Sequence, residues 1–293
     1  MSVHYTVPSK INLYLRLTGK RKDGFNNLCT VFQKISLSDS LSARKIARGC
    51  TIMPKGIIPP CSTRDNLIYK AYSVLKKKKR FTGGVAFTIE KSIPFGAGLG
   101  GASADCAYAL QAVNDLYSLR IDKQELMDIG GSLGSDVPLF LQSYNTALGI
   151  EKGDKLIDLG KMPRYWVLLV FFDQPLSTQA VYSKVRYPKD FQINLTKIRR
   201  EVIMLSQFLS NGKIVSSGSA LKNDLSEVAF KVMPEIKDVL KALKQKCKCA
   251  CAMTGSGSTV FAIFRTKRDA HQAEKQLVSY TGINSMVVCP TLH

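Results

Sequence analysis

The sequence predicts an α+β protein with two domains, at residues 1–155 and 156–293. Stretches in which apolar and polar residues alternate predict half-buried strands, and stretches with capping residues and helical spacing predict helices. The strands occur partly as hairpins rather than in strict alternation with helices, which argues against a doubly wound sheet. A chain of 293 residues is long enough for two domains of average size.

The first domain is expected to begin with strands and to continue with helices. Polar and apolar residues alternate from residue 10 to residue 17, which places Lys10 and Asn12 on one face of a strand. Asp65 and Asn66 can cap a helix, and the basic run at 76–80 suits its C-terminal end, where the helix dipole favours cations. The expected elements are strands at 3–7, 11–17, 25–37 and 84–93, a turn at 22–24, and helices from Asn66 to the basic run, at 102–116 and at 121–134.

The second domain is expected to follow a loop at residues 149–162. Trp166 begins an apolar run that is typical of a buried strand. Two further strands flank the turn at 254–258, whose glycines and serines favour a hairpin. The expected elements are strands at 166–172, 249–253, 259–264 and 284–288, and helices near Thr178 and at 195–210, 234–245 and 267–279.

The chain is strongly basic, with 42 Lys and Arg against 22 Asp and Glu and a net charge of +20. Such a charge attracts polyanions without selecting among nucleic acid, membrane surface and phosphorylated small molecules. No run of about eighteen apolar residues predicts a membrane-spanning helix, and the N-terminus lacks the features of a secretory signal. We therefore expect a cytoplasmic monomer or weak dimer, with no specific nucleic-acid partner and no membrane partner.

The eight cysteines are expected to be reduced, because a chain of this length can bury its own core and no export signal is present. Cys247, Cys249 and Cys251 would share one face of a strand, about 6.5 Å apart. No histidine or C-x-x-C pair lies nearby to complete a zinc site. Packing within a strand is therefore the favoured interpretation.

A glycine-rich segment, PFGAGLGGASAD at residues 94–105, separates a predicted strand from a predicted helix. It does not fit the Rossmann pattern, because Pro94 interrupts the strand and a helix stands where the second strand is needed, nor Walker A, because no Lys-Ser or Lys-Thr pair follows the last glycine. The H-R-D and D-F-G segments of protein kinases are absent. Glycine-rich backbone followed by a helix N-terminus nevertheless suits phosphate. The segment predicts a phosphate-binding loop, with a tightly packed turn as the alternative.

Two further segments accompany this loop, PSKINLYL at residues 8–15 and TGSGSTVF at 254–261. Together the three resemble the motifs of the GHMP kinases, the superfamily of galactokinase, homoserine kinase, mevalonate kinase and phosphomevalonate kinase. KDGF at 22–25, DNLI at 65–68 and LGSDVPLF at 133–140 are similar to a member that acts on a cytidine diphosphate sugar alcohol, in the non-mevalonate pathway to isoprenoid precursors. The resemblance covers nearly the whole chain. It implies a first domain like domain 2 of ribosomal protein S5 and a ferredoxin-like second domain.

Phosphorylation of an alcohol requires a base for the hydroxyl proton and groups that hold the charge of the phosphoryl group. None of the three histidines lies in a matching segment, so the base is expected to be a carboxylate. Asp136 follows a predicted helix, and its alternative role is to cap the next one. By resemblance Asp136 is the catalytic aspartate, and Lys10 is the cation that keeps it ionised.

The resemblance also implies an ATP site. Ser103 can bond phosphate or Mg²⁺, and Asn66 and Lys91 are expected near the adenosine. Mg²⁺ is expected because the oxygens of the transferred group must be neutralised, but no protein ligand is assigned to it. The residues expected around the phosphates are Pro94, Phe95, Gly96, Ala97, Gly98, Leu99, Gly100, Gly101, Ala102, Ser103 and Ala104.

For the acceptor, the resemblance implies that Phe25 and Tyr182 enclose the cytosine, since aromatic faces stack on a flat base. Asn12, Asn26 and Thr178 complete the expected acceptor site. The family usually has a histidine at the position of Asn26, and an amide can likewise donate and accept hydrogen bonds. For each ring taken alone, packing in the core is the alternative.

Two other functions remain open at this point. The chain could be a different kinase of the superfamily, acting on mevalonate, homoserine or a sugar. From another class, the charge of +20 and the S5-like domain allow an RNA-binding protein without catalysis. The presence of Lys10, Asp136 and the complete glycine-rich loop argues against the RNA-binding alternative. The leading prediction is a kinase that uses ATP and a cytidine diphosphate sugar alcohol, and acceptor preference would distinguish it from the other kinases of the superfamily.

Overall fold

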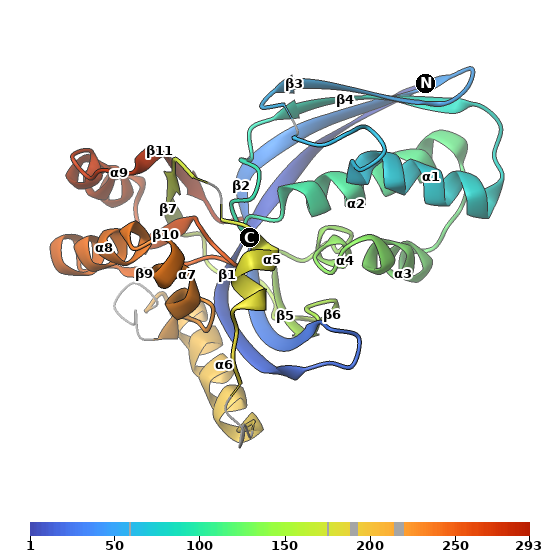
Figure 1. The fold of residues 1–293 in the computed structure, drawn as a ribbon. Coiled ribbons are helices and arrows are strands. Elements are labelled where there is room, and N and C mark those ends of the chain that lie inside the picture. Colours follow the sequence, from blue (N-terminus) through green and yellow to red (C-terminus); the bar gives the residue numbers. More distant parts are fainter. Residues whose placement is uncertain (59, 175, 188–192, 214–219) are drawn as a thin grey trace. The chain divides into compact units, whose positions relative to one another are not determined.

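The structure is a computed structural model and describes residues 1–58, 60–174, 176–187, 193–213 and 220–293. Helices and strands alternate irregularly along the chain, which confirms the α+β class (Figure 1). The chain forms two compact units, each assembled from separate segments, and the domain boundary expected at residue 155 stays a prediction. Unit 1 comprises Met1–Ser9, Leu37–Phe95 and Gly100–Ser143, and unit 2 comprises Lys10–Ser36, Gly96–Leu99 and Tyr144–His293.

The strands of unit 1 form a sheet in which β4 lies between β3 and β2. β2 and β4 are antiparallel, and β3 and β4 are parallel. β1 and β2 are long, and each contributes one end to unit 1 and the other to unit 2. The strands are β1 (Ser2–Lys20), β2 (Asn26–Ile46), β3 (Cys50–Gly56) and β4 (Gly84–Lys91).

Two of these strands differ from the sequence-based expectation. β1 is one strand of 19 residues, where two strands separated by Pro8 and Ser9 are predicted. The hydroxyl of Ser9 donates to the carbonyl of Leu37 in β2 at 2.6 Å, so a polar contact supports the strand where proline lacks an amide. β3 is absent from the predicted elements because it contains Pro54 and is largely exposed, and therefore shows no apolar alternation.

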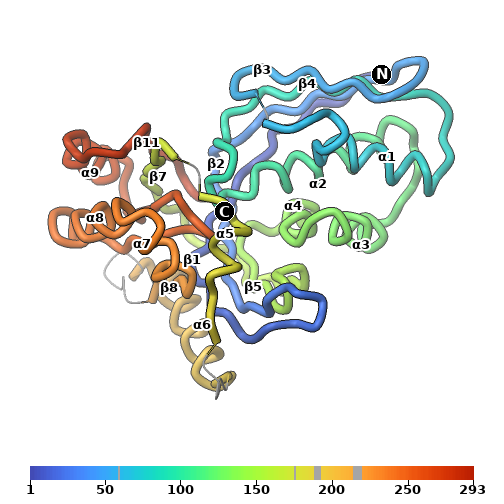
Figure 2. The backbone as a smooth tube through the Cα atoms, in the orientation of Figure 1, coloured from blue at the N-terminus to red at the C-terminus, as the bar shows by residue number. Residues whose placement is uncertain are grey.

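The helices of unit 1 begin and end close to the predicted residues. The side chain of Asn66 accepts a hydrogen bond from the amide of Ile68 and caps α1. Asp122 caps α3 in the same way, through the amide of Glu125. α1 and α2 lie side by side (Figures 1 and 2). The helices are α1 (Leu67–Lys79), α2 (Gly101–Tyr117), α3 (Lys123–Leu133) and α4 (Val137–Phe140).

In unit 2 a hairpin of β5 and β6 replaces the loop expected at residues 149–162, so that expectation is wrong. Most residues of β6 are exposed, and a short exposed strand gives little apolar pattern to detect. β5 also pairs with β2, and the two-residue strand β8 runs parallel to β1. The strands are β5 (Thr146–Glu151), β6 (Lys155–Asp158) and β8 (Lys222–Asn223).

A second sheet in unit 2 is antiparallel, with the strand order β11-β7-β10-β9. The predicted hairpin is confirmed, because β9 and β10 pair from Ala250↔Ile263 to Met253↔Val260. Buried side chains of this sheet and of the helices beside it form one hydrophobic cluster. The strands are β7 (Trp166–Phe172), β9 (Ala250–Met253), β10 (Val260–Phe264) and β11 (Ile283–Pro290).

The helices of unit 2 include one that was not expected, α7. In Figure 1, α8 and α9 lie beside the second sheet. α6 buries Val202, Leu205 and Leu209 at helical spacing, as an amphipathic helix does. The helices are α5 (Thr178–Ser183), α6 (Leu195–Ser210), α7 (Ser226–Val232), α8 (Glu235–Ala242) and α9 (Lys267–Leu277), and a π-helical turn, η3, follows α8 (Leu243–Cys247).

The three closely spaced cysteines do not share one strand face as predicted. Cys247 ends the π-helical turn, Cys249 precedes β9 and Cys251 lies within it. Cys249 and Cys251 are buried and take part in the hydrophobic cluster of unit 2. Among the described residues, no group of three or more His, Cys, Asp or Glu side chains is arranged to hold a metal ion.

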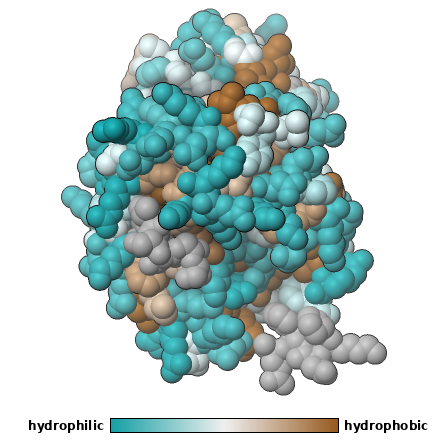
Figure 3. All heavy atoms as spheres, turned by 90° about the vertical axis from the view of Figure 1, so that its left-hand side faces the viewer, coloured by the Kyte–Doolittle hydropathy of each residue, from teal (hydrophilic) through white to brown (hydrophobic). Residues whose placement is uncertain are grey.

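Hydrophilic side chains cover most of the face that Figure 3 shows, with small hydrophobic areas between them. This is the surface expected of a chain with 42 basic and 22 acidic residues. Within the described part of the chain, the helices are all too short or too polar to cross a membrane.

Candidate active site

Lys10 and Asn12 point to the same face of β1, as the alternation predicts, and each is only 3% exposed. The Nζ of Lys10 donates to Oδ1 of Asn12 at 2.7 Å and to the carbonyl of Gly98 at 2.9 Å. The same ammonium group lies 5.6 Å from the centre of the Phe32 ring. The Lys10 side chain is therefore held against the glycine-rich loop within unit 2 by two hydrogen bonds.

The turn at residues 254–258 lies against the same part of the loop. Oγ1 of Thr254 accepts a hydrogen bond from the backbone amide of Asn12 at 2.9 Å. A Cβ atom placed on Gly98 would lie 2.5 Å from the carbonyl oxygen of Thr254, and Gly98 has a φ of +73°. Glycine is thus required at this position for its backbone conformation and for the close approach of the two loops.

The rest of the glycine-rich segment belongs to unit 1 and begins α2. Gly100 is the N-cap residue, and no side chain of the described residues forms a capping hydrogen bond there. Ala104 is the first residue whose amide bonds back to Gly100, so the amides of residues 101–103 lie ahead of the helical ladder. Such amides, together with the helix dipole, favour an anion. Ser103 lies in this first turn.

Lys91 forms a buried ion cluster with two carboxylates in unit 1. Its Nζ contacts Oδ2 of Asp39 and, at 2.7 Å, Oδ2 of Asp105. The carboxylate of Asp39 also accepts from the amides of Ser92 and Ile93 at 2.6 and 2.9 Å. By contrast, Oδ1 of Asp105 is buried and has no hydrogen-bond partner among the described residues.

This cluster joins the elements on either side of the glycine-rich segment, because Lys91 ends β4 and Asp105 lies in α2. Burial raises the pKa of Asp105 to about 7, although the nearby charge of Lys91 opposes the shift. Lys91 is expected near the adenosine, and the structure places its ammonium group, 1% exposed, between the two carboxylates.

Asn66 and Asp136 both stand at the N-terminal end of a helix in unit 1. The side-chain oxygen of Asn66 is used to cap α1. Asp136 occupies the N-cap position of α4, yet its carboxylate accepts no capping hydrogen bond from the described residues of that helix. The structure therefore does not support the alternative that Asp136 is only a helix cap.

Phe25 and Asn26 follow the predicted turn at residues 22–24, which the structure contains. Phe25 is 60% exposed, and the Nζ of Lys152 lies 5.7 Å from the centre of its ring. The side-chain oxygen of Asn26 accepts a hydrogen bond from the hydroxyl of Tyr187 at 2.8 Å. An exposed ring beside a cation and an oriented amide are suited to a flat, polar base.

Tyr182 and Thr178 come from α5. Tyr182 is partly buried against the hydrophobic cluster of unit 2, so packing accounts for part of its surface. The hydroxyl of Thr178 lies 2.8 Å from that of Ser256, which links α5 to the turn at residues 254–258. Thr178 is thereby connected to the turn that contacts Asn12 and Gly98.

The structure adds four polar residues that the sequence analysis does not identify: Asp39, Asp105, Tyr187 and Asn223. Asp105 carries a detectable signal, because it is an acidic residue within the otherwise apolar and small residues of α2. The other three lie outside the quoted motifs, and their roles depend on contacts with residues distant in the sequence. No local pattern predicts such contacts.

Comparison with known proteins gives consistent matches. The sequence model of the GHMP kinases N terminal domain matches residues 66–143, and that of the GHMP kinases C terminal region matches residues 204–284. A protein of Syntrophus aciditrophicus named 4-diphosphocytidyl-2-C-methyl-D-erythritol kinase is 36% identical over 275 residues, covering 92% of each chain. A protein of Pelobacter propionicus with the same name is 35% identical over 288 residues, covering 96% of each.

Solved structures show the same relationship. A crystal structure of 4-(cytidine 5'-diphospho)-2C-methyl-D-erythritol kinase matches with a TM-score of 0.81 and 30% identity, covering 99% of this chain and 100% of that one. A homoserine kinase from Cytophaga hutchinsonii, 19% identical, shares the fold with a TM-score of 0.73, covering 99% of this chain and 94% of that one. The fold, the motifs and relatives above 30% identity agree. The chain therefore belongs to the GHMP kinases and, among them, to the 4-diphosphocytidyl-2-C-methyl-D-erythritol kinase family.

Proposed function

We propose that the chain transfers the γ-phosphoryl group of ATP to the 2-hydroxyl of 4-diphosphocytidyl-2-C-methyl-D-erythritol, a reaction of the non-mevalonate pathway to isoprenoid precursors. One observation carries the proposal: Lys10, Asn12, Gly98 and Thr254, from three segments far apart in the sequence, join in one hydrogen-bonded group. Each segment is a motif of the family to which the chain belongs. The names of its relatives support the acceptor.

The proposed ATP site uses the glycine-rich segment. The amides of residues 101–103, which precede the first hydrogen bond of the helical ladder, and the positive end of α2 attract phosphate oxygens. Gly98 lets the loop pack closely against the turn at residues 254–258, because a Cβ atom there would lie 2.5 Å from the carbonyl oxygen of Thr254. Asn66 and Lys91 are proposed to lie near the adenosine, the latter through a side chain that the ion cluster holds in place.

Mg²⁺ is part of this proposal. The ion is usually bound through phosphates and water with few protein ligands, and the hydroxyl of Ser103 in the first turn of α2 is a suitable oxygen donor. When bound, Mg²⁺ neutralises charge on the phosphate oxygens. The amides of α2 and the ammonium of Lys10 add positive charge from the protein itself.

We propose that Asp136 accepts the proton of the acceptor hydroxyl. A general base of this kind contributes about 100-fold or more to the rate. Lys10 is proposed to stabilise negative charge that develops in the transition state. Its hydrogen bonds to Asn12 and Gly98 fix the ammonium group, so that little reorganisation is needed during the reaction.

The proposed cytosine site consists of Phe25 and Tyr182 as stacking rings, with Asn12, Asn26 and Thr178 as polar groups. The exposure of Phe25 at 60% supports this role, because a ring without core contacts is available to a ligand. Asn26 takes the place of the family's usual histidine, and its bond to Tyr187 orients the amide. We further propose that the protein acts in the cytoplasm as a monomer or weak dimer, which cell fractionation and sedimentation would test.

The test is a phosphoryl-transfer assay with ATP, Mg²⁺ and a panel of alcohols: the cytidine diphosphate methylerythritol, mevalonate, homoserine and galactose. We expect kcat/KM for the cytidine-bearing alcohol to exceed that for the others by about 1,000-fold or more, because buried polar groups discriminate strongly against an acceptor that leaves them unpaired. Preference for any other alcohol would overturn the assignment. Asp136→Asn, which keeps the shape but cannot accept the proton, serves as the inactive control.

A further inference from the structure

Asn223 holds the turn that contains Thr254. Its side-chain nitrogen donates to the backbone carbonyls of Met253 and Gly255, both at 2.8 Å. Its side-chain oxygen accepts from the amide of Leu225 at 2.9 Å. One side chain thereby fixes the carbonyl groups on both sides of Thr254, and all of these residues belong to unit 2.

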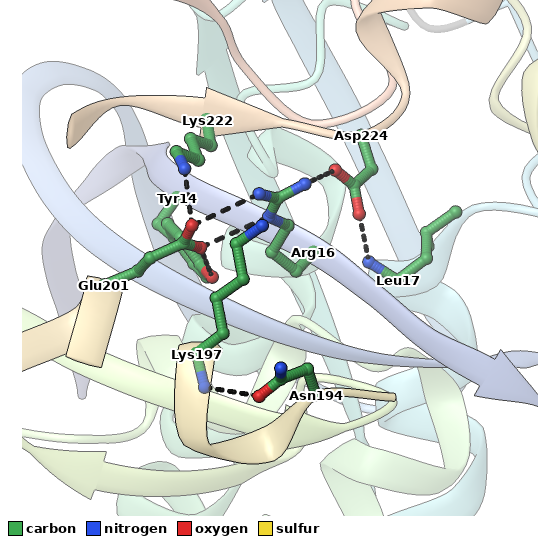
Figure 4. A network of polar contacts seen from close by, with 8 residues as sticks. All are labelled: Tyr14, Arg16, Leu17, Asn194, Lys197, Glu201, Lys222 and Asp224. Carbon is green, nitrogen blue, oxygen red and sulfur yellow. Dashed lines mark hydrogen bonds and ion pairs between the residues drawn. The ribbon is translucent and has the colours of Figure 1, made fainter. Parts of the chain in front are cut away.

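The segment that carries Asn223 is itself attached to β1. Asn223 stands opposite Leu15 in the parallel pairing of β8 with β1, and the amide of Asp224 donates to the carbonyl of Leu15 at 3.0 Å. The carboxylate of Asp224 accepts from the amide of Leu17 at 2.9 Å and from the guanidinium of Arg16 at 2.7 Å, as Figure 4 shows. Both oxygens of the Asp224 carboxylate are thus bonded to residues of β1.

A second carboxylate, from α6, completes this network (Figure 4). Glu201 accepts hydrogen bonds from the hydroxyl of Tyr14 at 2.7 Å, from Lys222 and, at 3.4 Å, from Arg16. Burial alone would raise the pKa of Glu201, but the hydrogen bonds from Lys222, Tyr14 and Arg16 outweigh it and lower the pKa to about 2. Glu201 is therefore ionised at neutral pH, and the hydrogen bond that it accepts from Lys222 ties β8 to α6.

We infer that Asn223 is a positioning residue for phosphoryl transfer. It fixes the turn whose Thr254 bonds to Asn12, and Asn12 in turn accepts from the ammonium group of Lys10. Each step in this path is a hydrogen bond of 2.7 to 2.9 Å. The inference rests on the proposed kinase function, because the role of Lys10 belongs to that function.

The chemistry of the contact requires an amide. The side-chain nitrogen of asparagine carries two N–H donors, which match the two backbone carbonyls. Its side-chain oxygen is an acceptor, which matches the one backbone amide. Aspartate would keep the bond to the amide of Leu225 but would set a carboxylate oxygen against the carbonyls of Met253 and Gly255. Protonation of that carboxylate restores one donor. Asn223→Asp therefore introduces a defect that acid partly repairs.

The experiment measures kcat and both KM values for the wild type, Asn223→Asp and Asn223→Ala between pH 6 and pH 9. We expect both variants to lose about 10-fold in kcat at pH 8, the effect of one lost buried hydrogen bond. The kcat of Asn223→Asp divided by the kcat of the wild type should rise at least about 3-fold from pH 8 to pH 6, because a carboxyl group placed among backbone carbonyls has a pKa above its usual range. The ratio for Asn223→Ala should stay constant.

Asn114 provides the matched control. Its side chain also clamps backbone, accepting from the amide of Ile121 at 3.0 Å and donating to the carbonyl of Ile121 at 3.3 Å, but it lies in unit 1. Asn114→Asp and Asn114→Ala should lower the unfolding midpoint while their kcat ratios stay flat with pH. Circular dichroism at each pH verifies that every variant assayed is folded.

The outcomes separate the two proposals. A wild type without transfer activity rejects the proposed function, whereas an active wild type with a flat Asn223→Asp ratio rejects the positioning role. An equal pH response in Asn114→Asp would also reject it, because the response would then reflect general stability. If both Asn223 variants fail to fold while both Asn114 variants fold, Asn223 has a purely structural role and the inference is overturned.

Discussion

The hydroxyl of Thr254 accepts a hydrogen bond from the backbone amide of Asn12 at 2.9 Å, and 242 positions in the sequence separate the two residues. The same hydroxyl lies 3.3 Å from the side-chain oxygen of Asn12, the atom that also receives the bond from Lys10. Thr254 is fully buried. The position of the Lys10 ammonium therefore depends on one hydroxyl from the far end of the chain.

Replacement of Thr254 by valine should reduce stability and turnover together. Valine has nearly the same shape but leaves the buried amide of Asn12 without an acceptor, which costs about 1–3 kcal/mol in the free energy of unfolding. We expect kcat to fall about 10-fold as Lys10 loses its fixed partner. Thr254→Ser keeps the hydroxyl and should retain most of the activity. Equal losses in the two variants, measured by urea unfolding and steady-state kinetics, would contradict this role of the hydroxyl.

Gly98→Ala should weaken ATP binding, because the added Cβ would lie 2.5 Å from the carbonyl oxygen of Thr254 and force the two loops apart. We expect KM for ATP to rise about 10-fold or more, a change of at least about 1.4 kcal/mol. Gly160→Ala is the control, since Gly160 has a similar φ of +78° but open space around it. If the two variants raise KM for ATP equally, backbone strain alone explains the result.

The pH dependence of stability should reveal Asp105. Its pKa of about 7 in the folded protein, against 3.8 for the ordinary group, means that the folded state retains a proton that the unfolded chain has released. The free energy of unfolding should therefore fall as pH rises through this window and level off above about pH 7. Asp105→Asn cannot titrate and should lose this slope.

Urea unfolding of both proteins at pH 5 and pH 8 measures the effect. The stability of Asp105→Asn relative to the wild type should increase from pH 5 to pH 8, because only the wild type loses stability over that range. Asp39→Asn is the comparison, since Asp39 also accepts from the amides of Ser92 and Ile93 and its loss should destabilise the protein at both pH values. A constant difference between Asp105→Asn and the wild type would show that Asp105 is ionised in the folded protein.

Phe25→Ala should raise KM for the acceptor without a loss of stability. The ring is 60% exposed, so its removal leaves little cavity, whereas a stacked base would lose about 1–3 kcal/mol of binding. KM for ATP should stay within about 2-fold. Tyr182→Ala should raise the acceptor KM as well but should also lower the unfolding midpoint, because Tyr182 packs against the hydrophobic cluster of unit 2. Unchanged acceptor KM in both variants would remove the two rings from the cytosine site.

Asn26→His introduces the residue that the family usually has at this position. If the side chain meets the cytosine, histidine should keep or lower the acceptor KM, because its ring nitrogens can donate and accept like the amide. A second variant tests whether the orientation of the Asn26 amide matters. Tyr187→Phe removes the hydrogen bond from Tyr187 and lets the Asn26 side chain rotate. A raised acceptor KM in Tyr187→Phe with an unchanged KM for ATP is the expected result.

Local patterns predict most of the fold correctly. The alternation from Lys10 to Leu17 places Lys10 and Asn12 together, and Asn66 and Asp122 cap the helices where capping residues stand in the sequence. Failures occur where the pattern is weak. The hairpin of β5 and β6 is too exposed to show apolar alternation, and β8 is only two residues long.

The candidate site is predictable to a similar extent. Contiguous motifs identify Lys10, Gly98 and Thr254 because each is surrounded by distinctive neighbours. Asn223 has no such surroundings, and its side chain donates to the carbonyls of a turn about thirty positions away. Contacts of this kind are set by the packing of the folded chain, which one sequence does not reveal.

The use of β1 by both units has a consequence for the synthesis of the protein. Residues 10–20 emerge from the ribosome early, but the hydrogen bond between Asn12 and Thr254 cannot form until Thr254 has been added, 242 residues later. At about 5–20 residues per second this delay lasts about 10 to 50 seconds. During that time Leu15 and Leu17 of β1 lack the C-terminal residues with which they form the hydrophobic cluster of unit 2. Formation of the hydrogen-bonded group around Lys10 is thus one of the last events in the folding of the nascent chain.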